Sequence, residues 1–219
     1  MSTMTVSIAH EAGMNHGFRT HHRSFLLGLL LAALPALSPA VSAQTTSQAQ
    51  AVQATLLQLG LPGVSLPGTT TVLASTSSLP PGIEGALDAS LIAGSVPTML
   101  SADSLHATVI GLTDRASSEA SLGSLGMFVA GNTISADFVM AQALSGAAPA
   151  GLSEIDGLVI NGTRITPTGE RGQTVPILGG VAILNEQQTG AGGVAVTALH
   201  VIVNGVADVL VATASAAAP

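Results

Sequence analysis

Gly157-Leu-Val-Ile-Asn-Gly-Thr-Arg-Ile-Thr166 is the stretch that says most about the fold. Two short runs rich in apolar and β-branched residues flank the dipeptide Asn161-Gly162. Asn and Gly readily adopt the positive φ angles of a two-residue type I′ turn, and the twist of that turn matches the twist of paired antiparallel strands. The stretch therefore predicts a β-hairpin.

A second hairpin is predicted upstream. Residues 122–130 and 133–143 show two-residue periodicity and flank Gly131-Asn132, a good tight-turn dipeptide. Alternate side chains of a strand point to the same face. In the second arm this places four apolar side chains on one buried face: Ile134, Ala136, Phe138 and Met140.

The same alternation covers the C-terminal part of the chain. Residues 194–203 and 206–213 are predicted to form two arms joined near Asn204-Gly205, and residues 175–185 are predicted to form another strand. In that strand one face carries Val175, Ile177, Gly179, Val181 and Ile183.

Nearer the N-terminus, Thr69–Ser75 is β-branched and predicts a strand, whereas Ile83–Leu91 is predicted as a short helix or turn that Pro97 ends. Short strands at spacings of about a dozen residues, with turn signals between them, are typical of all-β proteins. We predict an antiparallel β-sandwich, with a β-solenoid as the alternative.

The N-terminus has the three parts of a secretory signal peptide. A basic stretch ends at Arg23, an apolar run follows from Phe25 to Leu37, and Val41 and Ala43 are the small residues that a signal peptidase reads. The apolar run is shorter than the roughly 20 residues that span a bilayer. We predict a signal peptide over 1–43, a linker over 44–50 and a single domain over 51–219. The protein is therefore expected to be exported to the cell surface, the periplasm or the medium, with no transmembrane helix after cleavage.

Composition limits the function classes. Charged residues make up 8% of the chain, the formal net charge is −7 and there is no cysteine. Ordinary soluble domains carry about 25% charged residues. The sparse positive charge argues against nucleic acid as a partner, because nucleic acid requires a basic surface. Without disulfides, the core alone must stabilise the fold.

His106 and His200 are the histidines that follow the predicted cleavage site. They could act as metal ligands or as a catalytic base, or they could be ordinary strand residues. Alternation places each one opposite its preceding leucine, at an exposed or half-exposed position. A hydrolase with both histidines at its site is the third functional hypothesis, and the absence of a catalytic motif favours a protein that is not an enzyme.

A polar cluster, Asn185-Glu186-Gln187-Gln188, ends an apolar strand. Its first three residues and His200 are the candidates for a functional loop, and a plain turn is the alternative.

Calcium is a second use for the acidic residues, because it binds several carboxylate oxygens. Glu154 and Asp156 could join Asp137 or Asp208 around this ion, and a solvated loop is the alternative. No other cofactor is expected.

Much of the predicted domain resembles the bacterial domain family called choice-of-anchor P. The residues that carry the resemblance are Ile134-Ser-Ala-Asp-Phe-Val139, Leu158-Val-Ile-Asn-Gly162, Ile183-Leu-Asn-Glu-Gln187, Val196-Thr-Ala-Leu-His-Val201 and Asp208-Val-Leu-Val-Ala212. The resemblance implies an exported domain without an assigned activity. Members of the family are followed by sorting signals, and none is seen in Ala214–Pro219, so release or attachment to other surface components is expected.

The function expected from these features is that of a structural or adhesive domain, secreted or at the cell surface. Its partners would be surface components or further copies of itself, because strands with few charged residues can pair edge to edge. The alternative is an extracellular module that holds a small apolar or lipidic ligand between its sheets, which the high apolar fraction of the sequence favours.

Overall fold

The computed structural model of the protein describes residues 46–57, 68–190 and 193–219, and these residues form β-strands and connecting turns. The predicted signal peptide and its cleavage site lie outside the described residues. None of the described segments is a helix with the length and hydropathy needed to cross a membrane. The strands are β1 Gln48–Leu56, β2 Thr69–Ser75, β3 Gly85–Val96, β4 Leu100–Gly111, β5 Ala116–Val129, β6 Asn132–Leu144, β7 Ala150–Asp156, β8 Val159–Ile160, β9 Thr163–Arg164, β10 Gln173–Ile177, β11 Gly180–Gly190, β12 Gly193–Val203 and β13 Ala207–Ala217.

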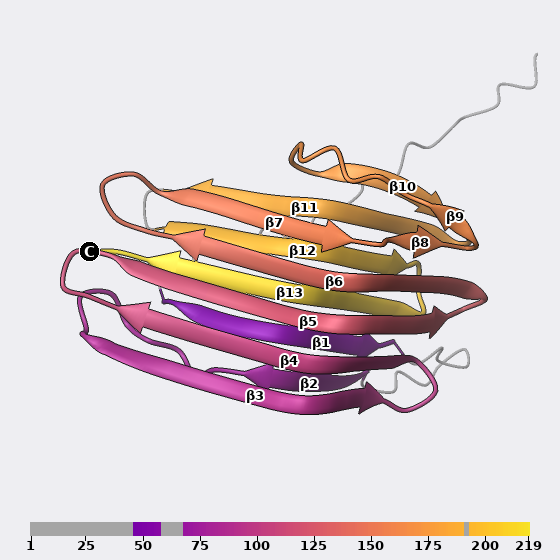
Figure 1. Cartoon of the computed structure of the whole chain (residues 1–219), viewed down its shortest axis with the longest axis horizontal. Helices are drawn as coiled ribbons and strands as arrows, with labels where there is room; N and C mark the ends of the chain where they lie inside the picture. The colour runs from indigo at the N-terminus through magenta and orange to yellow at the C-terminus, as the bar shows by residue number, and fades with distance from the viewer. Residues whose placement is uncertain (1–45, 58–67, 191–192) are drawn as a thin grey trace, which may run out of the picture. The chain divides into compact units, whose positions relative to one another are not determined.

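The strands form two antiparallel sheets that pack face to face as a β-sandwich (Figure 1). Sheet I has the order β10-β11-β12-β13-β1-β2, and sheet II has the order β3-β4-β5-β6-β8-β9, with β7 also paired to β6. Every strand pair is antiparallel, so the predicted sandwich is confirmed and the alternative of a β-solenoid is wrong.

The core lies between the sheets and is built from alternate side chains of each strand. Fully buried examples are Leu122 and Val139 from sheet II and Leu199 and Val209 from sheet I. Alanine, valine and leucine supply most of this core. In a chain without cysteine, the burial of these side chains is the main source of stability.

Near the middle of each long strand the alternation of buried and exposed residues is interrupted. The buried positions switch there between even-numbered and odd-numbered residues, which we call a change of parity. In β4, Leu100 and Ala102 are buried before Ser104, whereas Leu105 and Ala107 are buried after it. Ser104 has a φ of 50°, in the left-handed region. One such residue lets two residues oppose a single partner, bends the strand and moves the following side chains to the other face. The pairing of β4 with β5 shifts register at this point.

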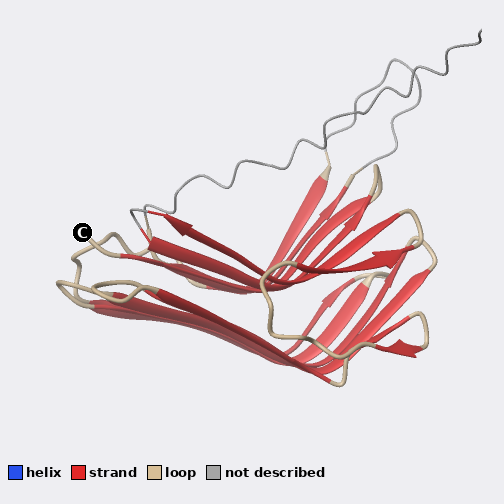
Figure 2. Ribbon diagram, turned by 90° about the horizontal axis from the view of Figure 1, so that it is seen from above, coloured by secondary structure: helices blue, strands red, loops and turns tan. Residues whose placement is uncertain are grey.

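These positions align across each sheet in a transverse row that we call the crease. The pairing in sheet I brings Asn185, Ala198, Ala212, Ala51 and Ala74 side by side. Every second member of that row has a positive φ, namely Asn185, Ala212 and Ala74. Both sheets bend along the crease in the same direction (Figure 2). The outer face of sheet I is therefore concave and the outer face of sheet II is convex.

Because of the crease, the buried face of β6 differs from the predicted one. Ile134 and Ala136 are buried as expected, but Val139 and Ala141 follow them into the core, so the prediction for Phe138 and Met140 was wrong. Both of those side chains are only half-buried. A prediction from strict alternation fails when the buried positions switch parity inside a strand.

Two turns also differ from the prediction in detail. Val129 pairs with Asn132, so the tight turn consists of Ala130 and Gly131, one residue earlier than expected. Residues 175–185 are not one strand, because β10 turns into β11 at Leu178-Gly179. Ala182 and Leu184 are buried in β11, whereas Val181 and Ile183 lie on its outer face.

Among the remaining predictions, one turn and one strand are correct, whereas one helix and one strand boundary are not. Asn161 and Gly162 have φ angles of 50° and 77°, as a type I′ turn requires, although β8 and β9 are only two residues long. The strand over Thr69–Ser75 is confirmed as β2. Ile83–Leu91 is not helical, because most of it belongs to β3, which ends just before Pro97. β1 begins at Gln48, inside the segment predicted as a linker.

Candidate functional site

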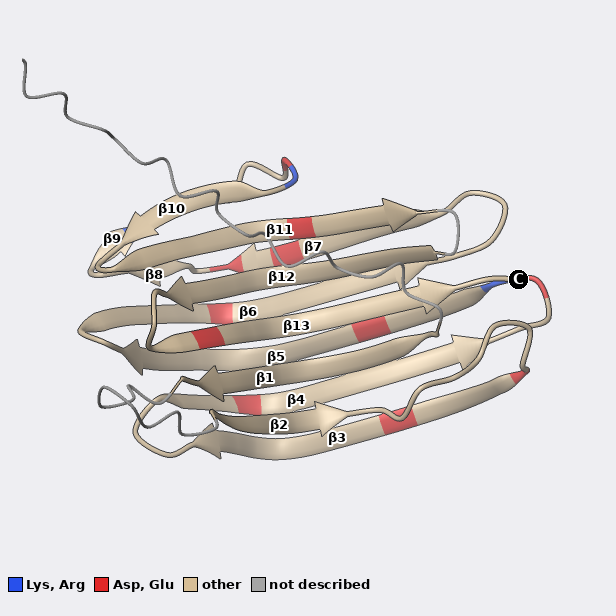
Figure 3. Cartoon of the chain, turned by 180° about the vertical axis from the view of Figure 1, so that it is seen from behind, with Lys and Arg blue, Asp and Glu red and all other residues tan. Residues whose placement is uncertain are grey.

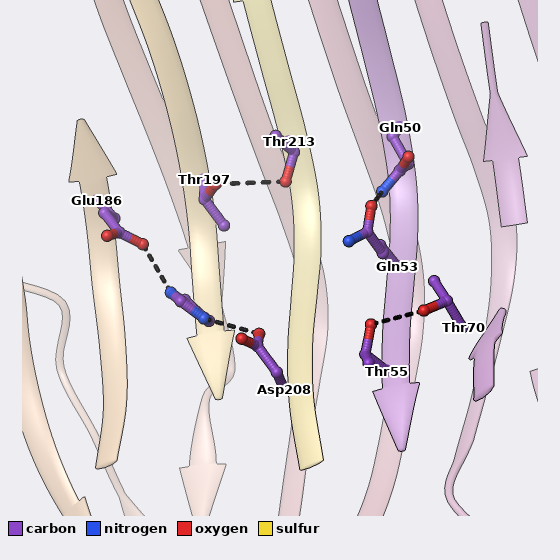
Figure 4. Close-up of polar contacts among 9 residues, drawn as sticks. Gln50, Gln53, Thr55, Thr70, Glu186, Thr197, Asp208 and Thr213 are labelled. Carbon is purple, nitrogen blue, oxygen red and sulfur yellow. Dashed lines mark hydrogen bonds and ion pairs between the residues drawn. The ribbon is translucent and has the colours of Figure 1, made fainter. Parts of the chain in front are cut away.

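The concave face of sheet I carries a row of polar side chains beside the crease (Figure 4). Three neighbouring pairs are hydrogen-bonded: Thr197 to Thr213 at 3.3 Å, Gln50 to Gln53 at 3.0 Å, and Thr55 to Thr70 at 3.0 Å. The fourth and most buried contact of this row is centred on His200. These side chains satisfy one another: the contacts of Thr197 and His200 link β11, β12 and β13, the Thr55–Thr70 contact links β1 to β2, and the Gln50–Gln53 contact lies within β1.

The imidazole of His200 lies between two carboxylates. Its Nδ1 is 2.7 Å from Oε2 of Glu186, and its Nε2 is 2.9 Å from Oδ1 of Asp208. Glu186 belongs to β11, His200 to β12 and Asp208 to β13. The ring therefore links three adjacent strands through charge-assisted hydrogen bonds.

The crease is the reason why these groups meet. In β11, Ala182 and Leu184 face the core, and strict alternation would place Glu186 there as well. The left-handed Asn185 between them reverses the parity and turns Glu186 onto the concave face. His200 on β12 pairs with Ile183 of β11 on one side and with Leu210 of β13 on the other. His200 is consequently only 7% exposed although it points away from the core.

The pKa of His200 is set by opposing effects. Burial lowers it, but the hydrogen bonds to Asp208 and Glu186 and the negative charges of both carboxylates outweigh burial, and the pKa rises from 6.5 to about 9. At neutral pH the ring is therefore a cation, with both N–H groups donated to carboxylates. A general base needs a free ring nitrogen, so His200 is unsuited to that role at neutral pH. The chemistry that this arrangement supports is a charged cross-link.

The polar residues beside Glu186 form contacts within the domain. They lie in the middle of β11 and not at a strand end, so the predicted functional loop or turn was misplaced. Nδ2 of Asn185 donates to the carbonyl of Gly169 at 2.8 Å, and the backbone N–H of Gly172 donates to the carbonyl of Asn185 at 2.9 Å. Nε2 of Gln187 lies 3.2 Å from the carbonyl of Gly151 in sheet II. Asn185 therefore holds the loop before β10, and Gln187 joins the two sheets.

The structure does not bring His106 and His200 together. His106 lies on the convex face of sheet II, where its Nδ1 is 3.4 Å from Oδ2 of Asp88. The whole sandwich core separates it from His200 on the concave face. Half-exposure is correct for His106 and wrong for His200, because neighbouring side chains on β11 and β13 cover the ring of His200.

The acidic residues proposed for calcium are also divided. Asp208 belongs to sheet I, whereas Asp137, Glu154 and Asp156 belong to β6 and β7 of sheet II. Within the described ranges, no three His, Asp or Glu side chains are arranged to hold a metal ion. The triad of Glu186, His200 and Asp208 does not converge on a point either, because its carboxylates lie on opposite edges of the ring.

Asn132 is a buried polar residue that the sequence analysis assigned only to a tight turn. It is 0% exposed, and its Nδ2 donates to the carbonyls of Val129 at 3.2 Å and Leu178 at 3.0 Å. Its Oδ1 accepts from the backbone N–H of Leu178 at 2.8 Å and from Nδ2 of Asn161 at 3.0 Å. One amide thus joins three turns from both sheets. Its place next to a turn glycine was visible, but the partner turns are remote in sequence.

Comparisons with known proteins give no relative for this chain: no family model, curated protein or solved structure matches it. The resemblance to choice-of-anchor P domains therefore stays a prediction.

Proposed function

We propose that the chain is an exported, non-enzymatic structural domain whose copies join through the edge of β3. The observation that carries this proposal is the open edge itself. β3 runs over Gly85–Val96 and is the last strand of sheet II in the part of the chain that the structure describes. A terminal strand presents a row of unpaired backbone N–H and C=O groups, which another strand can pair.

The usual protections of an edge strand are scarce on β3. Natural edges are shielded by lysine, proline, charged side chains or short length. β3 is 12 residues long and contains one charged residue, Asp88, with no lysine or proline. Ile92 is 92% exposed in its middle and Leu91 is exposed beside it. Charge is equally sparse on the neighbouring strands (Figure 3). The edge therefore favours association over repulsion.

The crease indicates how two copies would pair. Leu91 pairs with Leu105 and Ala93 with Asp103, so Ile92 lies in the crease beside Ser104. Two bent sheets continue as one sheet only where their creases coincide. In an antiparallel pair about a twofold axis, this condition places Ile92 of one copy against Ile92 of the other. That register also buries the most exposed apolar side chain of β3.

Ile92→Lys tests the proposal. Two lysines facing each other across the pair repel, so the dissociation constant of self-association should rise by about tenfold or more. Sedimentation velocity over a wide range of protein concentration measures it. Because Ile92 is almost fully exposed, the fold should be unchanged, which circular dichroism would verify.

The matched control is Leu178→Lys, which makes the same kind of change at an exposed position in the β10–β11 turn of sheet I. It should associate like the unaltered protein. A protein that stays monomeric at every concentration, or equal weakening by both substitutions, would rule out the β3 edge as the contact.

A further inference from the structure

A cleft at one end of sheet II concentrates exposed apolar side chains and an arginine. It has a volume of about 500 Å³, and its lining includes Ile110, Leu112, Leu144, Ala147 and Arg115. Ile110 pairs with Ser117, which in turn pairs with Leu144, so three adjacent strands, β4, β5 and β6, form the floor. Small-molecule sites typically occupy about 300–1,000 Å³ and are mostly apolar with a few placed polar groups.

The two loops that wall the cleft are held by hydrogen bonds. The backbone N–H of Leu112 donates to the carbonyl of Arg115 at 2.8 Å, which closes the β4–β5 turn. Ser145 is buried, and its hydroxyl accepts from the N–H of Ala116 at 2.9 Å. Gly146, at a φ of 116°, approaches so closely that a Cβ there would lie 3.0 Å from Cβ of Arg115. The walls are therefore formed before any ligand binds.

The charge of Arg115 selects the kind of ligand. The chain contains no lysine, and within the described ranges Arg115 makes no ion pair with a carboxylate. A guanidinium can donate two parallel hydrogen bonds to a carboxylate or phosphate. Ile110, Leu112 and Leu144 offer a surface to an alkyl chain beside it. Asp114, also in the lining, disfavours a dianion more than a monoanion.

From this arrangement we propose that the cleft binds a single-chain amphiphile with an anionic head group, the chain on Ile110 and Leu144 and the head group on Arg115. This site lies on the outer face of sheet II and not between the sheets, where core side chains fill the interior. It is independent of self-association through β3, because none of its lining residues belongs to that strand.

Calorimetric titration of the full chain with dodecanoate, below the concentration at which it forms micelles, tests the proposal. Saturable binding is expected, with a loss of about fourfold in affinity for each methylene removed from the buried part of the alkyl chain. When the two are compared at about pH 5.5, where dodecyl phosphate is mostly a monoanion, it should bind comparably, which would show that the site recognises a single negative charge and not the carboxylate alone. Dodecyltrimethylammonium, with the opposite charge, should bind at least about tenfold more weakly.

Two substitutions separate the head-group contact from the apolar floor. Arg115→Gln should weaken dodecanoate about tenfold, and Leu144→Asp should abolish saturable binding. Arg164→Gln, in the exposed β8–β9 hairpin, is the matched control and should bind like the unaltered protein. The proposal is overturned if dodecanoate shows no saturation, if the cationic amphiphile binds equally well, or if Arg115→Gln and Leu144→Asp both leave dodecanoate affinity unchanged.

Discussion

Raising the pH from 6.5 to about 9.5 should lower the free energy of unfolding by about 2 kcal/mol, and His200→Gln should remove this dependence. The folded-state pKa of His200, about 9, lies above the unfolded value of 6.5. The stabilisation is therefore complete below pH 6.5 and is lost as the pH rises through about 9. The shift converts to about 3 kcal/mol, and solvent screening at the half-exposed carboxylates Glu186 and Asp208 reduces it to about 2 kcal/mol.

Few other groups of the chain titrate in the pH range of this measurement. The chain has no cysteine, tyrosine or lysine, so histidine side chains and the terminal amine are the groups that ordinarily titrate between pH 6 and 10. Urea unfolding of the two proteins across this range gives the difference directly. His106→Gln is the control, since His106 is half-exposed and has one carboxylate neighbour at 3.4 Å. If His200→Gln keeps the full pH dependence, the ion-paired ring is not its source.

Asn132→Ala should destabilise the fold by about 3 kcal/mol, because it removes a buried amide that joins three turns. The substitution removes the four hydrogen bonds of this buried amide, among them those to the backbone N–H and carbonyl of Leu178, and each contributes about 0.5–1.5 kcal/mol. Chemical denaturation at pH 7 measures the loss. The slope of the transition should be unchanged, since the same surface is exposed on unfolding.

Asn204→Ala is the control for Asn132→Ala. Asn204 is likewise an asparagine next to a turn glycine, Gly205, but it is exposed, and a change there should fall within about 0.5 kcal/mol. Combining Asn132→Ala with Asn161→Ala should be less damaging than the sum of the two, because Nδ2 of Asn161 donates to Oδ1 of Asn132. Equal losses from Asn132→Ala and Asn204→Ala would show that the remote contacts of Asn132 contribute little.

Both predictions concern polar groups on which the domain relies in place of disulfides and dense surface charge. Glu186, His200 and Asp208 join three strands on the concave face, and Asn132 joins turns at one end of the sandwich. Neither cluster presents a free nucleophile or base. For this reason we favour self-association through β3 and ligand binding in the cleft over catalysis as functions of the domain.

Some local features of the fold could be predicted from particular residues, and others could not. The turn at Asn161-Gly162 is local chemistry, because the positive φ angles that it needs are intrinsic to Asn and Gly. β2 was equally readable from its β-branched residues. The helix or turn expected over Ile83–Leu91 failed because pairing with β4 outweighs the local signals of that segment. His200 and Glu186 were singled out as loop candidates and Asp208 as a calcium candidate, but the contacts of His200 with both carboxylates were not predicted, because the three residues lie on separate strands.

The sequence by itself determined that the chain is rich in strands, where several of the turns fall, and that neither disulfides nor a basic surface is available. These properties depend on residue type and near neighbours. Only the tertiary structure decided the crease, the faces of β6 and β11 beyond it, and the burial of His200. A left-handed residue such as Ser104 or Asn185 reverses the parity of a strand, and such residues align only when the strands pair. That alignment is a property of the sheets and cannot be seen in any single strand.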